Sequence, residues 1–323
     1  MLREFAIDPT MFDGWEKYSR IVLDCGVEHG RLISEFPNRW RKMVWEAFLA
    51  NPRRTARESE LMQYDLQTQL PSRMIPAARR YDFHEPNLDW LKQAEREHQQ
   101  KPFTAIVAAA NPRNAPRVLI ASELNKADKT SLWRDEREGS IPRTPAAIAG
   151  LARPLFAISK HVRFIDYNLA PEALRYKRSL QELLSVLANV NQGIRRVEVH
   201  IERKTDETFF LGKCNSEWLR MLGNGLELEI YRWKQRQDGP ELHRRFILTE
   251  RGGIWIDQGL DAGKPGEVTD VGLVSEEIRS QRWRDYDRTR TDANGARVET
   301  TFELVDAFKV NCSGCTQMQM PTG

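Results

Sequence analysis

The chain has 323 residues, of which 40% are hydrophobic and 29% charged, and its formal net charge is +3. These values are typical of a soluble protein with one or two cores, and they exclude a strongly basic protein that binds nucleic acid by bulk charge alone. Four cysteines are too few for a disulfide scaffold. The apolar runs are too short to cross a bilayer and the N-terminus lacks an apolar signal segment, so we expect a cytoplasmic protein.

Helices are predicted for most of the first hundred residues. Apolar side chains recur at helical spacing over 9–28 and again over 37–50, and each segment has a proline near its start. Residues 51–80 are polar and rich in arginine, with some helical character, and prolines interrupt the chain after them. We therefore expect a mainly helical N-terminal domain at 1–100.

The pattern changes near residue 103. Residues 103–109 and 117–122 are strand-like, and the sequence Asn-Pro-Arg-Asn between them at 111–114 is a turn signal. Residues 125–143 are charged and loop-like. The sequence thus predicts a hairpin and a charged linker region at 101–144.

From residue 145 onward, predicted strands and helices alternate. The expected helices cover 145–157, 171–190 and 216–222. The expected strands cover 162–166, 197–201 and 226–233, and a hairpin follows at 243–249 and 254–257. Alternation of this kind favours an α/β domain with a mixed sheet flanked by helices, here at 145–310, followed by a flexible tail at 311–323.

The tail contains a C-x-x-C pair, Cys312 and Cys315. One such pair supplies only two metal ligands and no second pair follows it, so no metal site is predicted. We favour two small residues of a mobile tail. A redox or metal clip between subunits is the alternative.

Two basic clusters contain aromatic residues. One lies around Trp40 and Trp45, and the other, at 279–290, surrounds Trp283. Basic residues mixed with aromatics suit phosphate contact with base stacking, but they equally suit the solvated face of an amphipathic helix, which we favour. The candidate nucleic-acid contacts are Arg39, Arg41, Lys42, Arg282 and Arg284.

The residues that could carry chemistry form one H-x-R-x4-E element. His243 and Arg245 are two apart on a predicted strand and so point to the same face, and Glu250 follows at the turn. Histidine can attack or protonate a phosphoryl group near neutral pH, and arginine binds phosphoryl oxygens through its planar fork. We predict that His243, Arg245 and Glu250 are catalytic, with the carboxylate orienting its neighbours.

Residues 241–263, with this element and Gly259-Leu260-Asp261, resemble the H-x-R…G-L-D segment of phospholipase D-like domains. The most similar branch is the C-terminal domain of MIT-domain proteins, whose first core strand resembles residues 162–167. The resemblance covers about 145–275. It implies a phospholipase D-like mixed sheet and a phosphodiesterase without cofactor or metal. Bacterial relatives often lie in mobile or phage-defence loci, which implies a nuclease of an anti-phage or mobile-element conflict system.

Five further residues are expected to support the phosphate site. The glycines, Gly252, Gly253 and Gly259, would permit the turn and a close backbone approach. Asp261 would orient a neighbour or cap a turn, and Asp166 would support the site from the preceding core strand. The standard motif of the family has Lys in place of Arg245 and Asp in place of Glu250; Arg is common in this branch, whereas Glu is less usual.

Catalytic members of the family bring two such motifs together, so that one histidine attacks phosphorus and the other protonates the leaving group. This chain has one complete motif, a half-site that a homodimer would complete. His161-x-Arg163 echoes the motif within the chain but lacks an acid at the matching place. His200, Glu202 and Lys204 alternate along a strand; they could add groups to a site, but we favour a solvated sheet face.

Three functions stay open at this point. The first is a phosphodiesterase, most plausibly a nuclease, that acts as a homodimer on nucleic acid. The second is a catalytically degenerate module that binds nucleic acid, phospholipid or a partner protein, with a membrane the less favoured target. The third is a scaffold subunit of a multi-protein defence complex.

Overall fold

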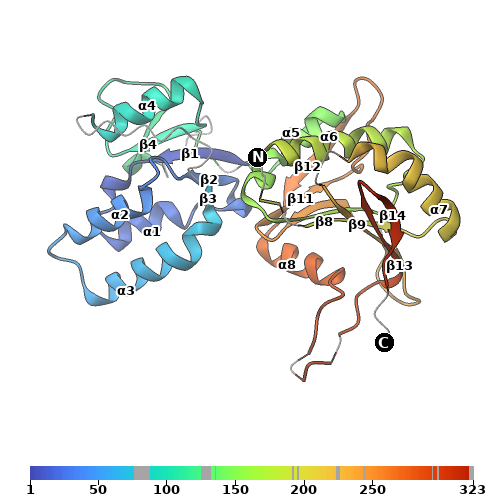
Figure 1. The fold of residues 1–323 in the computed structure, drawn as a ribbon. Coiled ribbons are helices and arrows are strands. Elements are labelled where there is room, and N and C mark those ends of the chain that lie inside the picture. The colour runs from blue at the N-terminus through green and yellow to red at the C-terminus, as the bar shows by residue number, and fades with distance from the viewer. Residues whose placement is uncertain are drawn as a thin grey trace. The chain divides into compact units, whose positions relative to one another are not determined.

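The computed structural model describes residues 1–75, 88–124, 132–134, 136–190, 193–194, 196–222, 226–242, 245–292, 294–296 and 298–319. The chain divides into two compact units, Met1–Arg137 and Glu138–Gly323, each of which we describe by itself (Figure 1). His243, the first residue of the predicted catalytic motif, lies outside the described residues.

The first unit is built on a five-stranded parallel sheet with the strand order β3-β2-β1-β4-β5. Its strands are β1 Arg3–Ile7, β2 Arg31–Ser34, β3 Met74–Ile75, β4 Ala105–Ala108 and β5 Val118–Ile120. Its α-helices are α1 Trp15–Val22, α2 Trp40–Leu49, α3 Ala56–Tyr64 and α4 Trp90–Gln100. Helices pack on both faces of the sheet, because Phe5 and Ile7 pack with residues of α1–α3, whereas Ala6 packs with residues of α4.

The structure corrects the sequence-based description of this unit in two respects. The expected helices are present, but the parallel sheet between them was missed because its strands are only two to five residues long. The predicted hairpin within 101–144 is wrong, because β4 and β5 are parallel, with Ile106 paired to Val118. The side chain of Asn111 hydrogen-bonds backbone groups of Ala115 and Val118, which shapes the connection that returns the chain to a parallel course.

The second unit contains a nine-stranded mixed sheet with the order β14-β13-β9-β8-β7-β10-β11-β12-β6. Strands β7 His161–Asp166, β8 Arg196–Glu202 and β9 Leu228–Lys234 are parallel to one another. The antiparallel strands are β6 Glu138–Pro142, β10 Arg245–Thr249, β11 Gly252–Ile256, β12 Val268–Leu273, β13 Glu303–Asn311 and β14 Gly314–Gln317. The prediction of a mixed sheet is confirmed.

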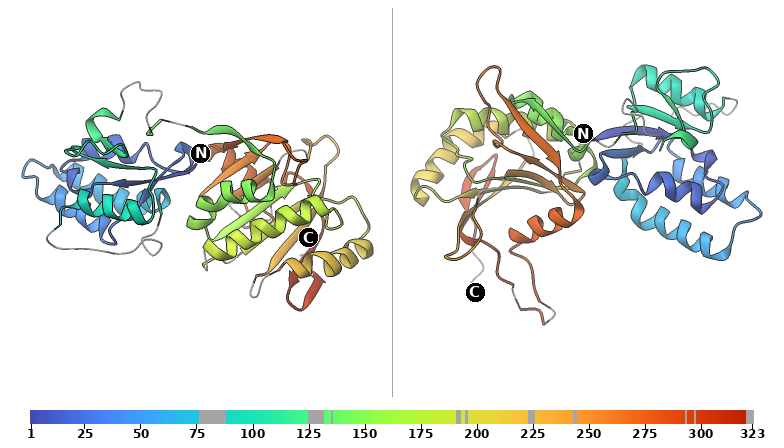
Figure 2. Two further views of the ribbon diagram at one scale, coloured as in Figure 1. Left: turned by 90° about the horizontal axis from the view of Figure 1, so that it is seen from above. Right: turned by 180° about the vertical axis from the view of Figure 1, so that it is seen from behind.

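Helices flank both faces of this sheet, as Figure 2 shows. Helices α5 Pro145–Ile158, α6 Leu174–Val190 and α7 Glu207–Lys213 lie on one side, and α8 Glu276–Asp285 lies on the other. Alternation along β7 explains the two faces: Phe164 meets Phe156 of α5, whereas Arg163 meets Trp283 of α8. One face is therefore apolar, and the other carries charge beneath α8.

Two predictions for the end of the unit also need correction. The expected helix at 216–222 starts earlier, as α7, and continues through the π-helical turn η7 Cys214–Trp218. Residues 311–319 are not a free tail, because β13 and β14 form an antiparallel hairpin at the edge of the sheet. The backbone N–H of Cys315 also donates to the side chain of Asn215, at 2.8 Å.

Candidate functional site

Strand β10 carries the predicted motif, and its pairing with β7 separates the two ends of that motif. Arg245 is opposite Asp166 and Thr249 is opposite Val162. Arg245 therefore stands where β7 ends, and Glu250 stands where β7 begins. Five residues of extended chain span about 17 Å, so Arg245 and Glu250 cannot act on one phosphoryl group.

Two cations meet at a tyrosine beyond the carboxyl ends of β7 and β8. The guanidinium of Arg245 lies 4.9 Å from the ring centroid of Tyr167 and donates to its hydroxyl at 2.8 Å. Lys204 Nζ lies 5.2 Å from the same ring, donates to the side chain of Asn168 and lies 3.4 Å from Glu202 Oε2. We call these four residues, Arg245, Tyr167, Lys204 and Asn168, the Arg245 site.

The Arg245 site retains donor capacity. Arg245 donates one N–H to the backbone carbonyl of Asp257 and another to Tyr167, but its buried Nε has no hydrogen-bond partner among the described residues. A guanidinium binds a carboxylate or a phosphate through adjacent N–H groups. The buried Nε is closed to a ligand, but a guanidinium has five N–H donors and only two are used here, so its remaining donors can bind an anionic oxygen.

Asp166 ties the Gly-Leu-Asp segment to the end of β7. Its carboxylate accepts the backbone N–H of Leu260 at 2.8 Å and that of Asn168 at 3.0 Å. Burial raises the pKa of Asp166, although these hydrogen bonds oppose the shift. Gly259 has φ +108°, and a Cβ there would lie 2.7 Å from Asp166 Oδ2, so only glycine fits without displacement.

Asp261 anchors the same segment from its other side. Its buried carboxylate contacts Arg143, and its Oδ2 lies 3.2 Å from Arg175 Nε. The structure thus brings Arg245, Asp166, Gly259 and Asp261 together. The two aspartates are engaged by protein groups and act by positioning.

Gly252 and Gly253 lie elsewhere, in β11, paired with Thr249 and Leu248 near the Glu250 end of the motif. A Cβ at Gly253 would lie 2.6 Å from a methyl carbon of Leu248. These glycines serve the packing of the β10–β11 hairpin, at a distance from the Arg245 site.

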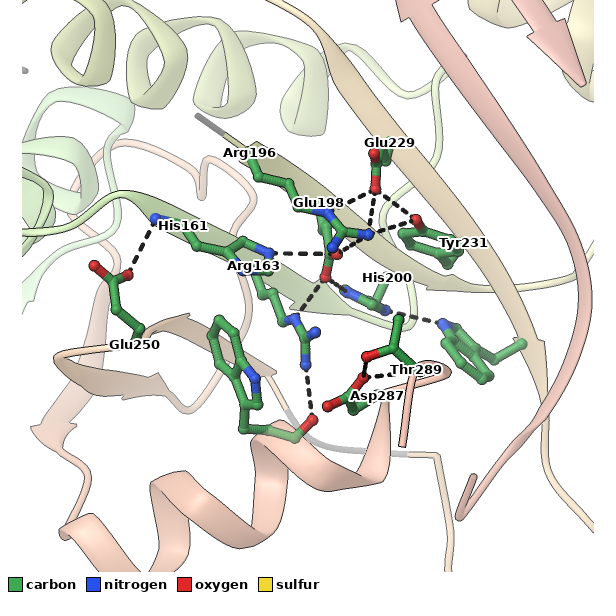
Figure 3. Close-up of polar contacts among 12 residues, drawn as sticks. His161, Arg163, Arg196, Glu198, His200, Glu229, Tyr231, Glu250, Asp287 and Thr289 are labelled. Carbon is green, nitrogen blue, oxygen red and sulfur yellow. Dashed lines mark hydrogen bonds and ion pairs between the residues drawn. The ribbon is translucent and has the colours of Figure 1, made fainter. Parts of the chain in front are cut away.

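Glu250 binds the backbone at the start of β7, as Figure 3 shows. One carboxylate oxygen accepts the N–H of Lys160 at 2.7 Å, and the other accepts the N–H of His161 at 3.0 Å. Glu250 therefore has a structural role, and the geometry does not favour its predicted catalytic role.

A buried carboxylate, Glu198, organises the sheet face beneath α8 (Figure 3). Arg163 Nε lies 2.5 Å from it, Arg196 2.8 Å, His200 Nε2 3.0 Å and His161 Nε2 3.3 Å. Burial by itself would raise the pKa of Glu198, but contacts with His161, His200 and Arg163 outweigh burial and hold that pKa well below its usual range. Glu198 is therefore ionised. We call these five residues the Glu198 network.

The expected solvated face at His200 is wrong, because His200 is 2% exposed. Its ring lies close to those of Tyr231, Trp233 and Tyr286, with centroid separations of 5.2, 5.8 and 5.0 Å. Trp233 Nε1 donates to His200 Nδ1 at 3.1 Å, so the ring proton of His200 belongs on Nε2, facing Glu198. Burial lowers the pKa of His200 to about 4.

The echo at His161-x-Arg163 does not supply a second half-site. His161 is five residues before Asp166 on β7, about 17 Å from the Arg245 end of the strand. The guanidinium of Arg163 lies 3.8 Å from the Trp283 ring and donates to its backbone carbonyl at 2.7 Å. Both residues belong to the Glu198 network.

The two basic clusters are partly neutralised by nearby acids. In α8, Arg282 pairs with Asp285 at 2.8 Å, while Arg284 is exposed. In the first unit, Arg41 pairs with Glu35 at 3.2 Å and Lys42 with Glu46 at 3.6 Å, and all three basic residues, Arg39, Arg41 and Lys42, are exposed.

Sequence reasoning missed most of the Arg245 site. Tyr167 and Asn168 directly follow β7, where side chains at the carboxyl end of a parallel strand commonly meet ligands. The sequence pattern placed Lys204 on a strand, but β8 ends at Glu202, so Lys204 lies beyond the sheet.

The described residues contain no group of three or more His, Cys, Asp or Glu side chains placed to hold a metal ion. None of the described helices is both long enough and apolar enough to cross a membrane.

Comparison with known proteins provides no family and no functional assignment. No family model matches the sequence, and no curated protein matches it. The chain is similar to the crystal structure of Nuc, a phospholipase D family member from Salmonella typhimurium, at 12% identity over 46% of this chain and 88% of Nuc, with a TM-score of 0.29. It is also similar to TrmBL2, an archaeal chromatin protein described with a novel mode of DNA binding, at 8% identity over 55% of this chain and 59% of TrmBL2, with a TM-score of 0.26. Neither score is high enough to bear on function.

Replacing Glu250 tests its structural role. Glu250→Ala removes the acceptor of two backbone N–H groups, so we expect a loss of about 1–3 kcal/mol in the free energy of unfolding, measured in urea. Glu241→Ala, at an exposed carboxylate nearby in sequence, serves as the control and should change stability by less than about 0.5 kcal/mol. An unchanged stability in Glu250→Ala would contradict the assignment.

The pKa of His200 predicts how stability depends on pH. The folded value of about 4 lies below the unfolded value of about 6.5. The unfolded chain thus binds more protons between these values, and stability is lost as pH falls through this window. We expect the unfolding free energy to fall by about 2 kcal/mol more in the wild type than in His200→Gln between pH 7 and pH 5. Equal losses in the two proteins would show that His200 is not held neutral.

Proposed function

We propose that the second unit is a phosphodiesterase that cleaves nucleic acid, with the Arg245 site and His243 as half of its active site. The observation that carries the proposal is the convergence of Arg245 and Lys204 on Tyr167, at the carboxyl ends of β7 and β8. A carboxylate, Glu202, lies 3.4 Å from Lys204, so an anionic phosphodiester would interact favourably with Arg245.

The chemistry follows from this placement. Arg245 and Lys204 bind the non-bridging oxygens, whose charge grows in the transition state. His243, two residues before Arg245, attacks phosphorus and forms a phosphohistidine, and the departing oxygen takes a proton from a second histidine. Water then attacks the phosphohistidine, and the second histidine removes the proton of that water.

The second histidine would come from a second copy of the chain. The second unit contains His161, His200 and His243, and the first two are bound in the Glu198 network. Pairing of two copies about a two-fold axis would place two His243 side chains at one site. We therefore propose a homodimer.

The choice of nucleic acid and of biological setting is part of the same proposal. In the second unit the exposed Arg284 on α8 is a candidate for a further phosphate contact, and in the first unit so are Arg39, the N-cap of α2, and Arg41 and Lys42 within α2. A role in an anti-phage or mobile-element conflict system, alone or as a subunit of a larger assembly, is supported only by the resemblance of residues 145–275 to phospholipase D-like proteins.

One observation favours a second candidate, a module that binds phosphate without cleaving it. Glu250, the acid of the motif, is engaged by backbone amides. In this alternative the motif stabilises the fold and does not catalyse a reaction, and the Arg245 site binds nucleic acid or a phospholipid headgroup.

Cleavage assays with matched variants test the proposal. Full-length protein is incubated with plasmid, single-stranded DNA and RNA in EDTA, and with bis(p-nitrophenyl) phosphate. We expect His243→Ala to abolish cleavage, and Arg245→Ala to slow it at least about 100-fold through loss of a transition-state donor. Arg220→Ala, at an exposed arginine on the same unit, should be unchanged.

Cleavage that persists in His243→Ala would overturn the proposal. If the wild type cleaves nothing but binds a fluorescent oligonucleotide or anionic vesicles, and Arg245→Ala weakens that binding, the non-catalytic module stands instead.

A further inference from the structure

Another guanidinium, that of Arg175, borders the segment that carries Asp261. Arg175 is the second residue of α6, and its side chain is 60% exposed. Its Nε lies 3.2 Å from Asp261 Oδ2, and its Cζ lies 5.1 Å from the ring centroid of Tyr176. The backbone N–H of Ala262 also donates to the carbonyl of Arg175, at 3.3 Å. These contacts fix the start of α6 against the Gly-Leu-Asp segment.

The acid that holds Arg175 lies beside Arg245. A Cβ at Gly259 would lie 3.2 Å from Arg245 Cδ and 3.3 Å from Asp261 Oδ1, so both side chains adjoin the same backbone position. The buried Tyr176 interacts with both cations: burial and two nearby carboxylates raise its pKa, and Arg175 and Arg245 both oppose the rise. The two guanidinium groups are therefore neighbours at one end of the sheet.

Arg175 retains charge and donors that the protein does not use. Its ion pair with Asp261 is made through Nε, and the described residues offer no hydrogen bond to its two Nη groups. Asp261 is shared, because Arg143 contacts the same carboxylate. Arg143 has a further acid, Glu267 Oε2 at 3.4 Å, whereas Asp261 is the one acid within ion-pair distance of Arg175 in the described part of the chain. The exposed end of Arg175 can therefore bind an anion of a ligand.

We propose that Arg175 binds a second phosphate of the nucleic-acid strand, a role that rests on the function proposed above because a strand must be held at Arg245. A strand carries one negative charge per nucleotide, so a phosphate bound by Arg245 brings its neighbours with it. The two Nη groups of Arg175 form a fork that matches two phosphate oxygens. Arg175 thus favours a polynucleotide over a small diester that has a single phosphate, and Asp261 positions it.

Binding of a labelled strand tests this role without cleavage. Full-length protein in a His243→Ala background is titrated into a fluorescein-labelled single strand of thymidylate, and anisotropy is measured over a series of salt concentrations. We expect Arg175→Ala to weaken binding about tenfold and to lower the slope of log affinity against log salt by about 0.7, the loss of one phosphate contact. Arg220→Ala, which removes an exposed arginine elsewhere on the unit, should leave both values unchanged.

Kinetics with two substrates separate phosphate binding from a structural role. Bis(p-nitrophenyl) phosphate has one phosphate, so Arg175→Ala in the otherwise wild-type protein should cleave it with unchanged kcat and KM. With the thymidylate strand, KM should rise about tenfold while kcat stays constant. If Arg175 only held Asp261 in place, the neighbouring Arg245 would be disturbed, and cleavage of both substrates would fall together.

The outcomes also separate this role from the proposed function. A wild-type protein that cleaves neither substrate refutes the proposed function, and the binding assay then decides the role of Arg175 by itself. Wild-type affinity and salt slope in Arg175→Ala would overturn the role, as would equal losses on the two substrates or no binding of the strand in the His243→Ala background. Arg175→Gln, which keeps an N–H for Asp261 but removes the charge, should behave as Arg175→Ala does, and circular dichroism of both variants checks folding.

Discussion

The register of β10 against β7 is the constraint on which the second unit depends. With Arg245 opposite Asp166, the guanidinium reaches Tyr167 at the carboxyl end of β7, while Glu250 reaches the backbone at the start of β7. Slippage by one residue would turn every side chain of β10 to the opposite face. The two ends of the motif therefore have different surroundings: Arg245 joins a cationic cluster around Tyr167, and Glu250 binds backbone amides.

The Glu198 network bears on function because it binds His161 and His200. A buried carboxylate surrounded by two arginines and two histidines is costly to desolvate and tolerable only when every partner is in place. Because His161 and His200 are bound in this network, neither is available for chemistry at the Arg245 site. That leaves His243 as the histidine of the second unit that can serve phosphoryl transfer, and it makes a second copy of the chain necessary for the catalysis that we propose.

The sequence was most informative where patterns were long. Alternation of strands and helices after residue 145 predicted the mixed sheet, and the sequence singled out Arg245, Asp166, Gly259 and Asp261, which the structure brings together. The parallel sheet of the first unit escaped because strands such as β3, with two residues, are too short to show a period. His200 packs against Tyr231, Trp233 and Tyr286, and the amides that bind Glu250 are 89 and 90 residues away, so no local pattern could reveal either arrangement.

The most direct test of this account is where a phosphate analogue binds. Crystals of the full-length protein soaked in tungstate would reveal the oxyanion by the anomalous scattering of tungsten. The account predicts a peak beside Arg245 and Lys204 in the wild type, and its loss in Arg245→Ala. A peak at the Glu250 end of β10, or a peak beside Lys204 that survives in Arg245→Ala, would contradict it.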